Sequence, residues 1–312
     1  MNNKYLRLLR FKFRKHFNGI YLRGFKGASL YDVLCFFVRH LSEGAIGVRA
    51  SSIAFHFFLA LFPGLIFLFS LIPFIQVDGF QSTLLAALKS TIPDRGYDLI
   101  AETVRDIILT QRGSIVSLGF FMMFYFSTNG VVAMFTAFNA TAHSIEKRSW
   151  LKKRLIASLL VLVNSIVLAV AIILIIWGKK LVNMIGAAMT LDNDLVFVGL
   201  WLLRWGVIII FLYSMFSLSY YFAPAKQDKW EFTSPGSMVS TLLSMLAIGG
   251  FSFYINNFSR YNKLYGSIGA VIVIMLWFYI QSYILLLGFE LNTSIKQIDK
   301  QNQQCNEEPE HS

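Results

Sequence analysis

Long apolar stretches alternate with short polar stretches along most of the chain. Six apolar stretches have about the 20 residues that an α-helix needs to cross the hydrocarbon core of a bilayer. They cover residues 53–75, 114–138, 155–177, 195–221, 237–256 and 266–290. The pattern predicts an all-α membrane protein with six transmembrane helices.

The last stretch is the most informative window of the chain. Residues 265–292 read YGSIGAVIVIMLWFYIQSYILLLGFELN, with no charged side chain between Gly266 and Phe289. The whole chain is 56% apolar and only 14% charged, with a mean hydropathy of +0.58. Soluble domains are about one quarter charged, so the composition also favours an integral membrane protein.

Lys and Arg are distributed unevenly between the polar segments, which gives the spans a direction. With the N-terminus in the cytoplasm, the inner segments hold 19 of the 28 basic residues and the outer segments hold 8, while Arg204 lies in the fourth span. This excess follows the positive-inside rule and predicts that both termini are cytoplasmic. The net charge of +11 therefore needs no nucleic-acid partner to explain it.

The segments outside the spans suggest three parts. Residues 1–52 predict a basic cytoplasmic arm, which either binds the anionic inner leaflet or stays solvated, followed by an amphipathic helix that lies in the interface. Residues 53–291 predict the six-helix transmembrane domain. Residues 292–312 predict a polar cytoplasmic tail, which we expect to be disordered.

The longest outer segment, between spans one and two, is patterned rather than random. Apolar residues recur at helical spacing between Tyr97 and Ile108, opposite a charged face. We therefore predict a helical extracytoplasmic cap there. Such a cap either gates a cavity or shields the ends of the spans.

Spans two and six share a weak internal similarity. At an offset of 153 residues, Gly113 aligns with Gly266, and Asn139 aligns with Asn292. If spans one and two correspond to spans five and six, the chain has the parallel repeat seen among transporters.

Polar residues and prolines inside a membrane span are costly, so each is a candidate functional or structural residue. The candidates are His56, Pro63, Asn129, Asn139, Arg204, Gln281 and Glu290. Side chains of this kind ordinarily form hydrogen bonds between helices, each contributing about 0.6–2 kcal/mol. We also expect close helix contacts at Gly249, Gly250, Gly266 and Gly269.

Arg204 is the most unusual of these candidates. It lies well inside the fourth apolar stretch, beside Trp201 and Trp205. Its guanidinium can pair with Asp192 or Asp194, or it can reach the outer interface by snorkelling.

Glu290 and the first span leave further alternatives open. We favour an ion pair of Glu290 with Arg49 or Arg154 over a role in proton transfer. His56 titrates near neutral pH, so proton coupling is an alternative to hydrogen bonding. Pro63 removes a backbone donor, and a broken first helix beside His56 would form a binding site.

The sequence predicts no catalytic residue, cofactor or metal site, and we expect no enzyme activity. A nuclease needs clustered carboxylates or histidines, or an acid–base pair, on the side of the membrane that holds RNA. The five histidines are scattered and the acidic residues lie mostly outside or in the tail. Cys35 and Cys305 have no neighbours with metal-ligand spacing.

Several segments resemble the YihY family, also called the virulence factor BrkB family, of six-span bacterial inner-membrane proteins. The resemblance covers roughly residues 40–295. It rests on the first-span stretch ASSIAFHFFLALFPGLIFLFSLIPF, on Pro235-Gly236 and on the window 265–292. His56 departs from the aromatic residue common in the family, and Ala60 departs from its usual Ser.

The resemblance implies a multi-pass inner-membrane protein but no settled activity. Family members have carried a virulence label and, historically, a ribonuclease label. We expect a transport-type or lipid-handling protein of unknown substrate, with a non-transporting envelope scaffold as the alternative and a membrane-bound ribonuclease disfavoured. At 35.5 kDa the chain is small for a transporter working alone, which favours a homo-oligomer.

Overall fold

The computed structural model describes residues 44–74, 86, 112–142, 145–188, 193–225, 234–257 and 267–307. The elements in these ranges are helices, joined by turns and short irregular segments. They are α3 (Gly44–Leu71), the 3₁₀ helix η1 (Ile72–Phe74), α6 (Gly113–Thr141), α7 (Trp150–Ala188), α8 (Asn193–Phe222), α9 (Pro235–Asn257) and α11 (Ser267–Glu307). The predicted interfacial helix and the predicted cap lie outside the described residues.

Six of the described helices are long and apolar enough to cross a membrane, which confirms the predicted all-α, six-span architecture. These spans are Ile46–Leu71, Gly113–Thr141, Trp150–Gly178, Val196–Phe222, Pro235–Ile255 and Val271–Gln297. The first begins earlier than the apolar pattern predicts. Its added turns are held by protein contacts, because Ile46 and Ala50 are buried and Arg49 donates a 2.6 Å hydrogen bond to Thr141.

The first helix is not broken at Pro63, whereas the bend expected of a proline there stays a prediction. Helix α3 runs without interruption from Gly44 to Leu71, with Pro63 inside it. A proline removes only one donor from the helical ladder, and the remaining bonds of the neighbouring turns can maintain the helix. The α-helix instead ends near Pro73, where it is followed by the 3₁₀ turn η1.

The expectation of a disordered tail after Asn292 is wrong as far as Glu307. Helix α11 continues through this polar sequence to Glu307. Leu291 and Ile295, one turn apart, are both buried, so the helix still packs against the protein beyond the last apolar stretch. Lys, Gln and Glu are also good helix formers, which favours the continuation.

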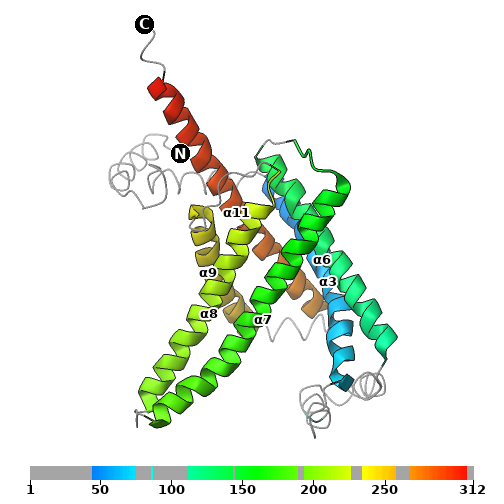
Figure 1. Ribbon diagram of the computed structural model, residues 1–312, viewed down its shortest axis with the longest axis vertical. Helices are drawn as coiled ribbons and strands as arrows, with labels where there is room; N and C mark the ends of the chain where they lie inside the picture. Colours follow the sequence, from blue (N-terminus) through cyan, green and yellow to red (C-terminus); the bar gives the residue numbers. More distant parts are fainter. Residues whose placement is uncertain are drawn as a thin grey trace. The chain divides into compact units, whose positions relative to one another are not determined.

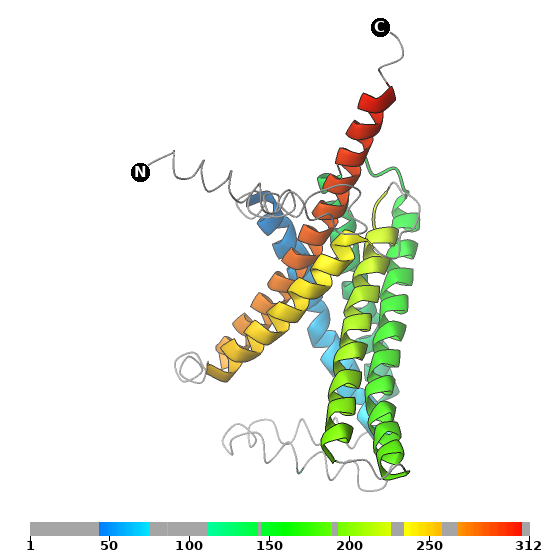
Figure 2. The same cartoon turned by 90° about the vertical axis from the view of Figure 1, so that its left-hand side faces the viewer.

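The chain divides into two compact units. The first unit comprises Met1–Ala54 and Val131–Ser312. Within it, α7 packs against α8, α8 against α9, and α9 against α11. Figures 1 and 2 show α7 and α8 as a long antiparallel pair and α9 lying along α11.

The second unit comprises Phe55–Gly130 and contains parts of α3 and α6. Glycines of α6 face phenylalanines of α3 at two levels of this unit. A Cβ atom added at Gly119 would lie 3.1 Å from the backbone of Phe67, and one added at Gly130 would lie 3.0 Å from the ring of Phe57. The absence of a side chain therefore allows the two helices to approach closely, as is common in membrane proteins.

Candidate functional site

The first turn of α9 is capped by its own sequence and by α11. Ser234 precedes Pro235, and a polar N-cap followed by proline favours a helix start. The Ser234 Oγ accepts the backbone N–H of Ser237 at 3.2 Å. Asn292 of α11 accepts the backbone N–H of Gly236 through Oδ1 at 2.7 Å and donates from Nδ2 to Ser234 Oγ at 3.2 Å. Two donors that a helix start leaves unsatisfied are thus bound.

The end of α8 is held in a similar way by side chains from α6 and from the α6–α7 connection. Asn139 of α6 accepts the backbone N–H of Ala225 through Oδ1 at 2.9 Å. Arg148 donates to the carbonyl oxygens of Phe222 at 3.4 Å and Ala223 at 2.8 Å. A cation at this position also suits the negative end of a helix dipole.

Arg148, Glu146 and Asn139 form one hydrogen-bonded group, here called the Arg148 cluster. Arg148 donates from Nε and Nη2 to the two carboxylate oxygens of Glu146, at 2.8 and 2.7 Å. Asn139 donates from Nδ2 to Glu146 Oε2 at 2.7 Å. The guanidinium carbon also lies 5.0 Å from the ring centre of Phe135, within the range of a cation–π contact.

The Arg148 cluster keeps its carboxylate ionised. Hydrogen bonds from Arg148 are the main cause that lowers the pKa of Glu146 from 4.5 to about 2, and the bond from Asn139 adds to the effect. The Arg148 side chain is only 9% exposed, so its charge needs this partner. The cluster therefore fixes the α6–α7 connection to the end of α8.

Helices α9 and α11 cross at two glycines. A Cβ atom added at Gly236 would overlap the carbonyl oxygen of Gly288 and lie 2.6 Å from Asn292 Nδ2. One added at Gly288 would overlap the hydroxyl oxygens of Ser240 and Tyr220. Gly236 and Ser240 are four residues apart, the spacing of small residues at close helix crossings.

Hydroxyl groups and aromatic rings close the space around this crossing. The hydroxyl oxygens of Tyr220 and Ser240 lie 2.6 Å apart, and Tyr220 donates to the carbonyl oxygen of Leu285 at 2.9 Å. The rings of Phe138 and Phe289 stack in parallel with their centres 3.9 Å apart. Both rings are buried, as is Tyr220.

These polar groups bind one another and the helix ends, so the chemistry that they support directly is structural. Of this set, the sequence predicts only Asn139 as a candidate. Four of the others are missed by the sequence analysis. Arg148 and Glu146 lie in a connection, Ser240 has a small side chain, and Tyr220 has a common one. Their spacing in the sequence gives no signal, since several of their partners are backbone atoms 65 to 75 positions away.

Gln281 is a polar side chain that forms a hydrogen bond between two helices. Its Oε1 atom accepts a hydrogen bond from Ser244 of α9 at 2.9 Å. Ser244 is fully buried, so this bond joins α9 and α11 inside the protein. The Nε2 atom of Gln281 is also buried and has no hydrogen-bond partner among the described residues.

Glu290 lies half-buried on α11, directly after the stacked Phe289. One of its two predicted partners, Arg49, makes its hydrogen bond to Thr141. The alternative uses of Glu290 stay predictions.

Three other candidates belong to the second unit. His56 is half-buried on α3, and its ring centre is 5.9 Å from that of Phe55. Its Nδ1 atom is buried and has no hydrogen-bond partner in the part of the chain that the structure describes. Pro63 lies two turns further along the same helix. Asn129 is half-buried on α6, beside the Gly130 that faces Phe57.

Arg204 is exposed on the surface of α8 in the first unit. The ring centres of Trp201 and Trp205 lie 6.3 Å apart in an edge-to-face arrangement. Trp201 is 55% exposed, so this tryptophan also faces outward. The side chains of Asp192 and Asp194, the expected partners of Arg204, lie outside the described residues.

Two of the glycines predicted to make close helix contacts, Gly249 and Gly250, do not make them with the described helices. A Cβ atom at Gly249 or Gly250 would meet no atom of the described residues within 4 Å, and both glycines are exposed. The close approach of α9 to α11 lies at Gly236 and Gly288 instead. Which glycine faces a neighbour depends on the rotation of the helix, and a glycine pattern alone does not give that rotation.

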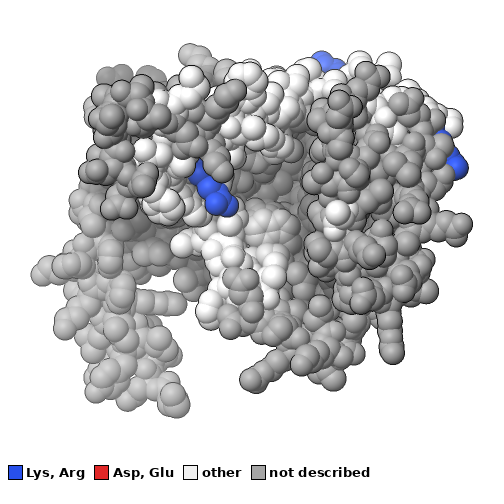
Figure 3. Space-filling view, turned by 90° about the horizontal axis from the view of Figure 1, so that it is seen from below, with Lys and Arg blue, Asp and Glu red and all other residues white. Residues whose placement is uncertain are grey.

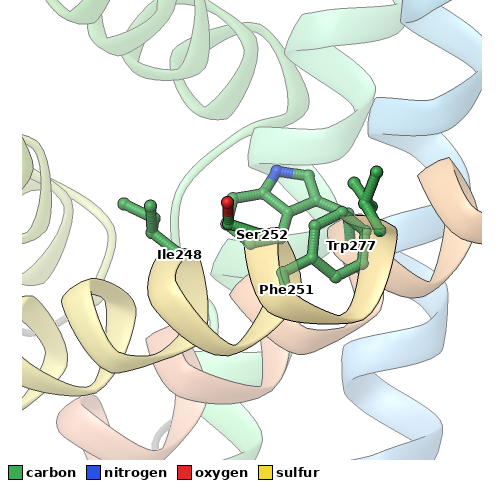
Figure 4. A pocket seen from close by; sticks show the side chains of 5 residues that line it. Ile248, Phe251, Ser252 and Trp277 are labelled. Carbon is green, nitrogen blue, oxygen red and sulfur yellow. The ribbon is translucent and has the colours of Figure 1, made fainter. Parts of the chain in front are cut away.

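An apolar pocket of about 300 Å³ lies between α9 and α11, in the membrane-spanning part of both helices. Ile248, Phe251, Ser252 and Ile255 of α9 line it together with Trp277 of α11. The rings of Phe251 and Trp277 pack 4.8 Å apart, and Figure 4 shows the side chains around the pocket. Ser252 is the polar side chain of this lining.

Charged side chains are sparse among the described residues that are visible in Figure 3. The described atoms visible there belong mostly to uncharged residues, with separate Lys or Arg side chains and no Asp or Glu. Within the described ranges, no three His, Cys, Asp or Glu side chains gather closely enough to hold a metal ion.

Comparison with known proteins gives a consistent assignment. A family model described as virulence factor BrkB matches residues 37–311. The chain is 29% identical over 245 residues to the ribonuclease-like protein YfkH of Bacillus subtilis (strain 168), covering 78% of this chain and 88% of that protein. It is 30% identical over 97 residues to a UPF0761 membrane protein of Idiomarina loihiensis, covering 31% and 34%. No solved structure matches the chain.

Proposed function

The chain belongs to the virulence factor BrkB family of multi-pass membrane proteins, and from this premise we propose that it handles a lipid-class substrate inside the bilayer. The apolar pocket between α9 and α11 carries the proposal. Its substrate has an apolar chain and a polar group, because the lining combines aromatic and aliphatic side chains with the hydroxyl of Ser252.

The pocket suits an acyl or isoprenoid chain better than a water-soluble molecule. Its volume is at the lower end of the range for ligand pockets, about 300–1,000 Å³, which is enough for part of a chain. It lies within two membrane spans, so a lipid can enter from the bilayer without crossing water. The ring of Trp277 forms a flat apolar wall against which such a chain can pack.

A pocket-filling variant tests the proposal. Ser252→Phe should fill the space beside Trp277 and lower the movement of fluorescent phospholipids across vesicles that contain the purified protein. Leu246→Phe is the matched control, because Leu246 is 63% exposed on the same helix and does not line the pocket. Lipids and metabolites that copurify with each variant would identify the substrate class.

Several outcomes would contradict the proposal. Wild-type protein that moves no lipid and retains none on purification would exclude lipid handling. Equal transport by both variants would exclude this pocket. Stable crosslinked protein partners in the absence of transport would favour the scaffold alternative, and RNA cleavage by protein free of soluble nucleases would favour a ribonuclease.

We further propose that the protein lies in the bacterial inner membrane with both termini in the cytoplasm, as the excess of Lys and Arg in the inner segments favours. The native Cys35 and Cys305 allow a test without new labels on the chain. In intact cells, a thiol reagent that cannot cross the inner membrane should leave both residues unlabelled. Labelling of either one before the membrane is broken would contradict this orientation.

A further inference from the structure

Arg204 is a charged side chain on the lipid-facing surface of a membrane span. It is exposed on α8, whose span is Val196–Phe222, and it lies about 12 Å along the helix axis from Val196. A charge at the centre of a span costs about 2.5–3.5 kcal/mol by insertion measurements. An exposed arginine at this depth therefore needs water or an anion at its guanidinium.

The geometry of the helix directs Arg204 toward the nearer membrane surface. Side chains of an α-helix lean toward its N-terminus, which for α8 is the end at Asn193. Trp201, three residues earlier, lies on the same face and is 55% exposed. Phe197, one turn before Trp201, is 69% exposed. These three residues form one outward stripe that leads from Arg204 to the interface.

We infer that Arg204 and Trp201 form a binding site for the phosphate of a membrane phospholipid. The guanidinium presents several donors in a planar fork that fits two phosphate oxygens, and the indole N–H of Trp201 supplies another donor. The acyl chains of the bound lipid lie along the next turns of α8, over the half-buried Ile208 and Phe211, which follow Arg204 on the same face at four and seven residues. An anionic headgroup binds best, because no cation of its own competes with the arginine.

This site is separate from the pocket between α9 and α11, and the inference goes beyond the proposed function. A lipid held by Arg204 stabilises α8 in the bilayer whether or not the protein moves lipids. Loss of the site and loss of transport can therefore be measured independently.

Fluorescence quenching by brominated lipids tests the site directly. The full-length chain has six Trp, and replacing Trp150, Trp177, Trp230 and Trp277 by Phe leaves Trp201 and Trp205 as reporters beside Arg204. This protein is placed in nanodiscs that contain brominated phosphatidylglycerol or brominated phosphatidylcholine. We expect the anionic lipid to be preferred about fivefold, the ratio that about 1 kcal/mol per charge gives.

Variants of Arg204 and a matched control complete the experiment. Arg204→Gln should remove the preference, and Arg204→Lys should keep part of it because the charge remains without the planar fork. Lys152→Gln is the control, because Lys152 is an exposed cation near the opposite end of the antiparallel pair of α7 and α8. It should leave the preference of the Trp201 and Trp205 reporters unchanged.

Two results would overturn the inference. An equal preference for the anionic lipid in Arg204→Gln and in the unsubstituted reporter would show that Arg204 does not bind the phosphate. The reporter protein could also show no preference for the anionic lipid until Asp192→Asn and Asp194→Asn are introduced. That result would show that a carboxylate, and not a phosphate, is bound to the guanidinium of Arg204. Monodisperse, helical protein in every variant shows that the comparison concerns folded chains.

Discussion

Asn139 and Asn292 hold the two ends of the same connection. The Oδ1 atom of Asn139 accepts the backbone N–H of Ala225 after α8, and the Oδ1 atom of Asn292 accepts that of Gly236 at the start of α9. The two asparagines are 153 residues apart, the offset at which spans two and six align. The internal repeat stays a prediction, because the backbone groups that the two asparagines bind, at Ala225 and Gly236, are not related by the same offset.

The two asparagines should differ in their tolerance of a negative charge. Asn139→Asp replaces the donor to Glu146 with a second carboxylate beside it, so we expect a loss of about 1–3 kcal/mol in the free energy of unfolding. Asn292→Asp should cost less, because its other partner is the hydroxyl of Ser234, which can turn and donate. Unfolding in detergent measures both variants, and an equal loss would contradict this account.

Gly288→Ala should destabilise the protein through the helix crossing. The added methyl group would occupy the space of the Ser240 and Tyr220 hydroxyl groups, so α9 and α11 would have to separate. Overpacking of this kind costs about 1–3 kcal/mol. Gly250→Ala on α9 is the control, because the added group would meet no atom and should leave the midpoint of thermal unfolding equal or higher. Similar midpoints for the two variants would show that the crossing is not tight.

Acid should lower the stability of the folded protein, partly by protonating Glu146. Its pKa is lowered in the folded protein from 4.5 to about 2, mainly by the hydrogen bonds from Arg148, so the unfolded chain binds more protons between these values. The stabilisation is complete above the unfolded value and is lost as the pH falls through about 2. The difference in unfolding midpoint between wild type and Glu146→Gln should therefore shrink as the pH falls from about 5. A difference that stays constant would exclude this role of Glu146.

The polar end of α11 should matter for stability as far as Ile295. This side chain is 5% exposed, and Ile295→Ala should lower the free energy of unfolding by about 2–5 kcal/mol. Gln297→Ala, on the exposed surface of the same helix, should change it by less than about 0.5 kcal/mol. Thermal unfolding of the two purified variants measures the contrast. If a chain that ends after Asn292 were as stable as the full chain, the packing of this segment would be unimportant.

The six spans could be predicted because the bilayer imposes a simple length and polarity requirement on each of them. The same requirement drew attention to charges inside apolar stretches, and so to Arg204, which proves to face outward. The requirement did not single out Arg148, because a basic residue in a connection is usually one of the charges that set the orientation of the spans. Only the folded chain shows that Arg148 is buried against the end of α8.

The helix contacts were harder to predict than the helices. Gly249 and Gly250 form a conspicuous pair in the sequence, yet neither contacts another described helix, whereas Gly236 does. The rotation of α9 about its axis decides this, and packing along the whole helix sets that rotation. The extension of α11 was missed for a related reason, because the buried Ile295 lies in a mostly polar stretch whose few apolar residues do not form a span.

Because α11 is long, a small rotation about its crossing with α9 at Gly288 would move the far end of the helix. The helix has 41 residues and is about 60 Å long, whereas a bilayer with its headgroups is about 40–45 Å thick. Glu307 lies about 28 Å along the axis from Gly288, so a rotation about the crossing would displace that end by about 0.5 Å per degree. A rotation about this crossing inside the membrane would therefore displace α11 most at the polar end that continues beyond the last apolar stretch.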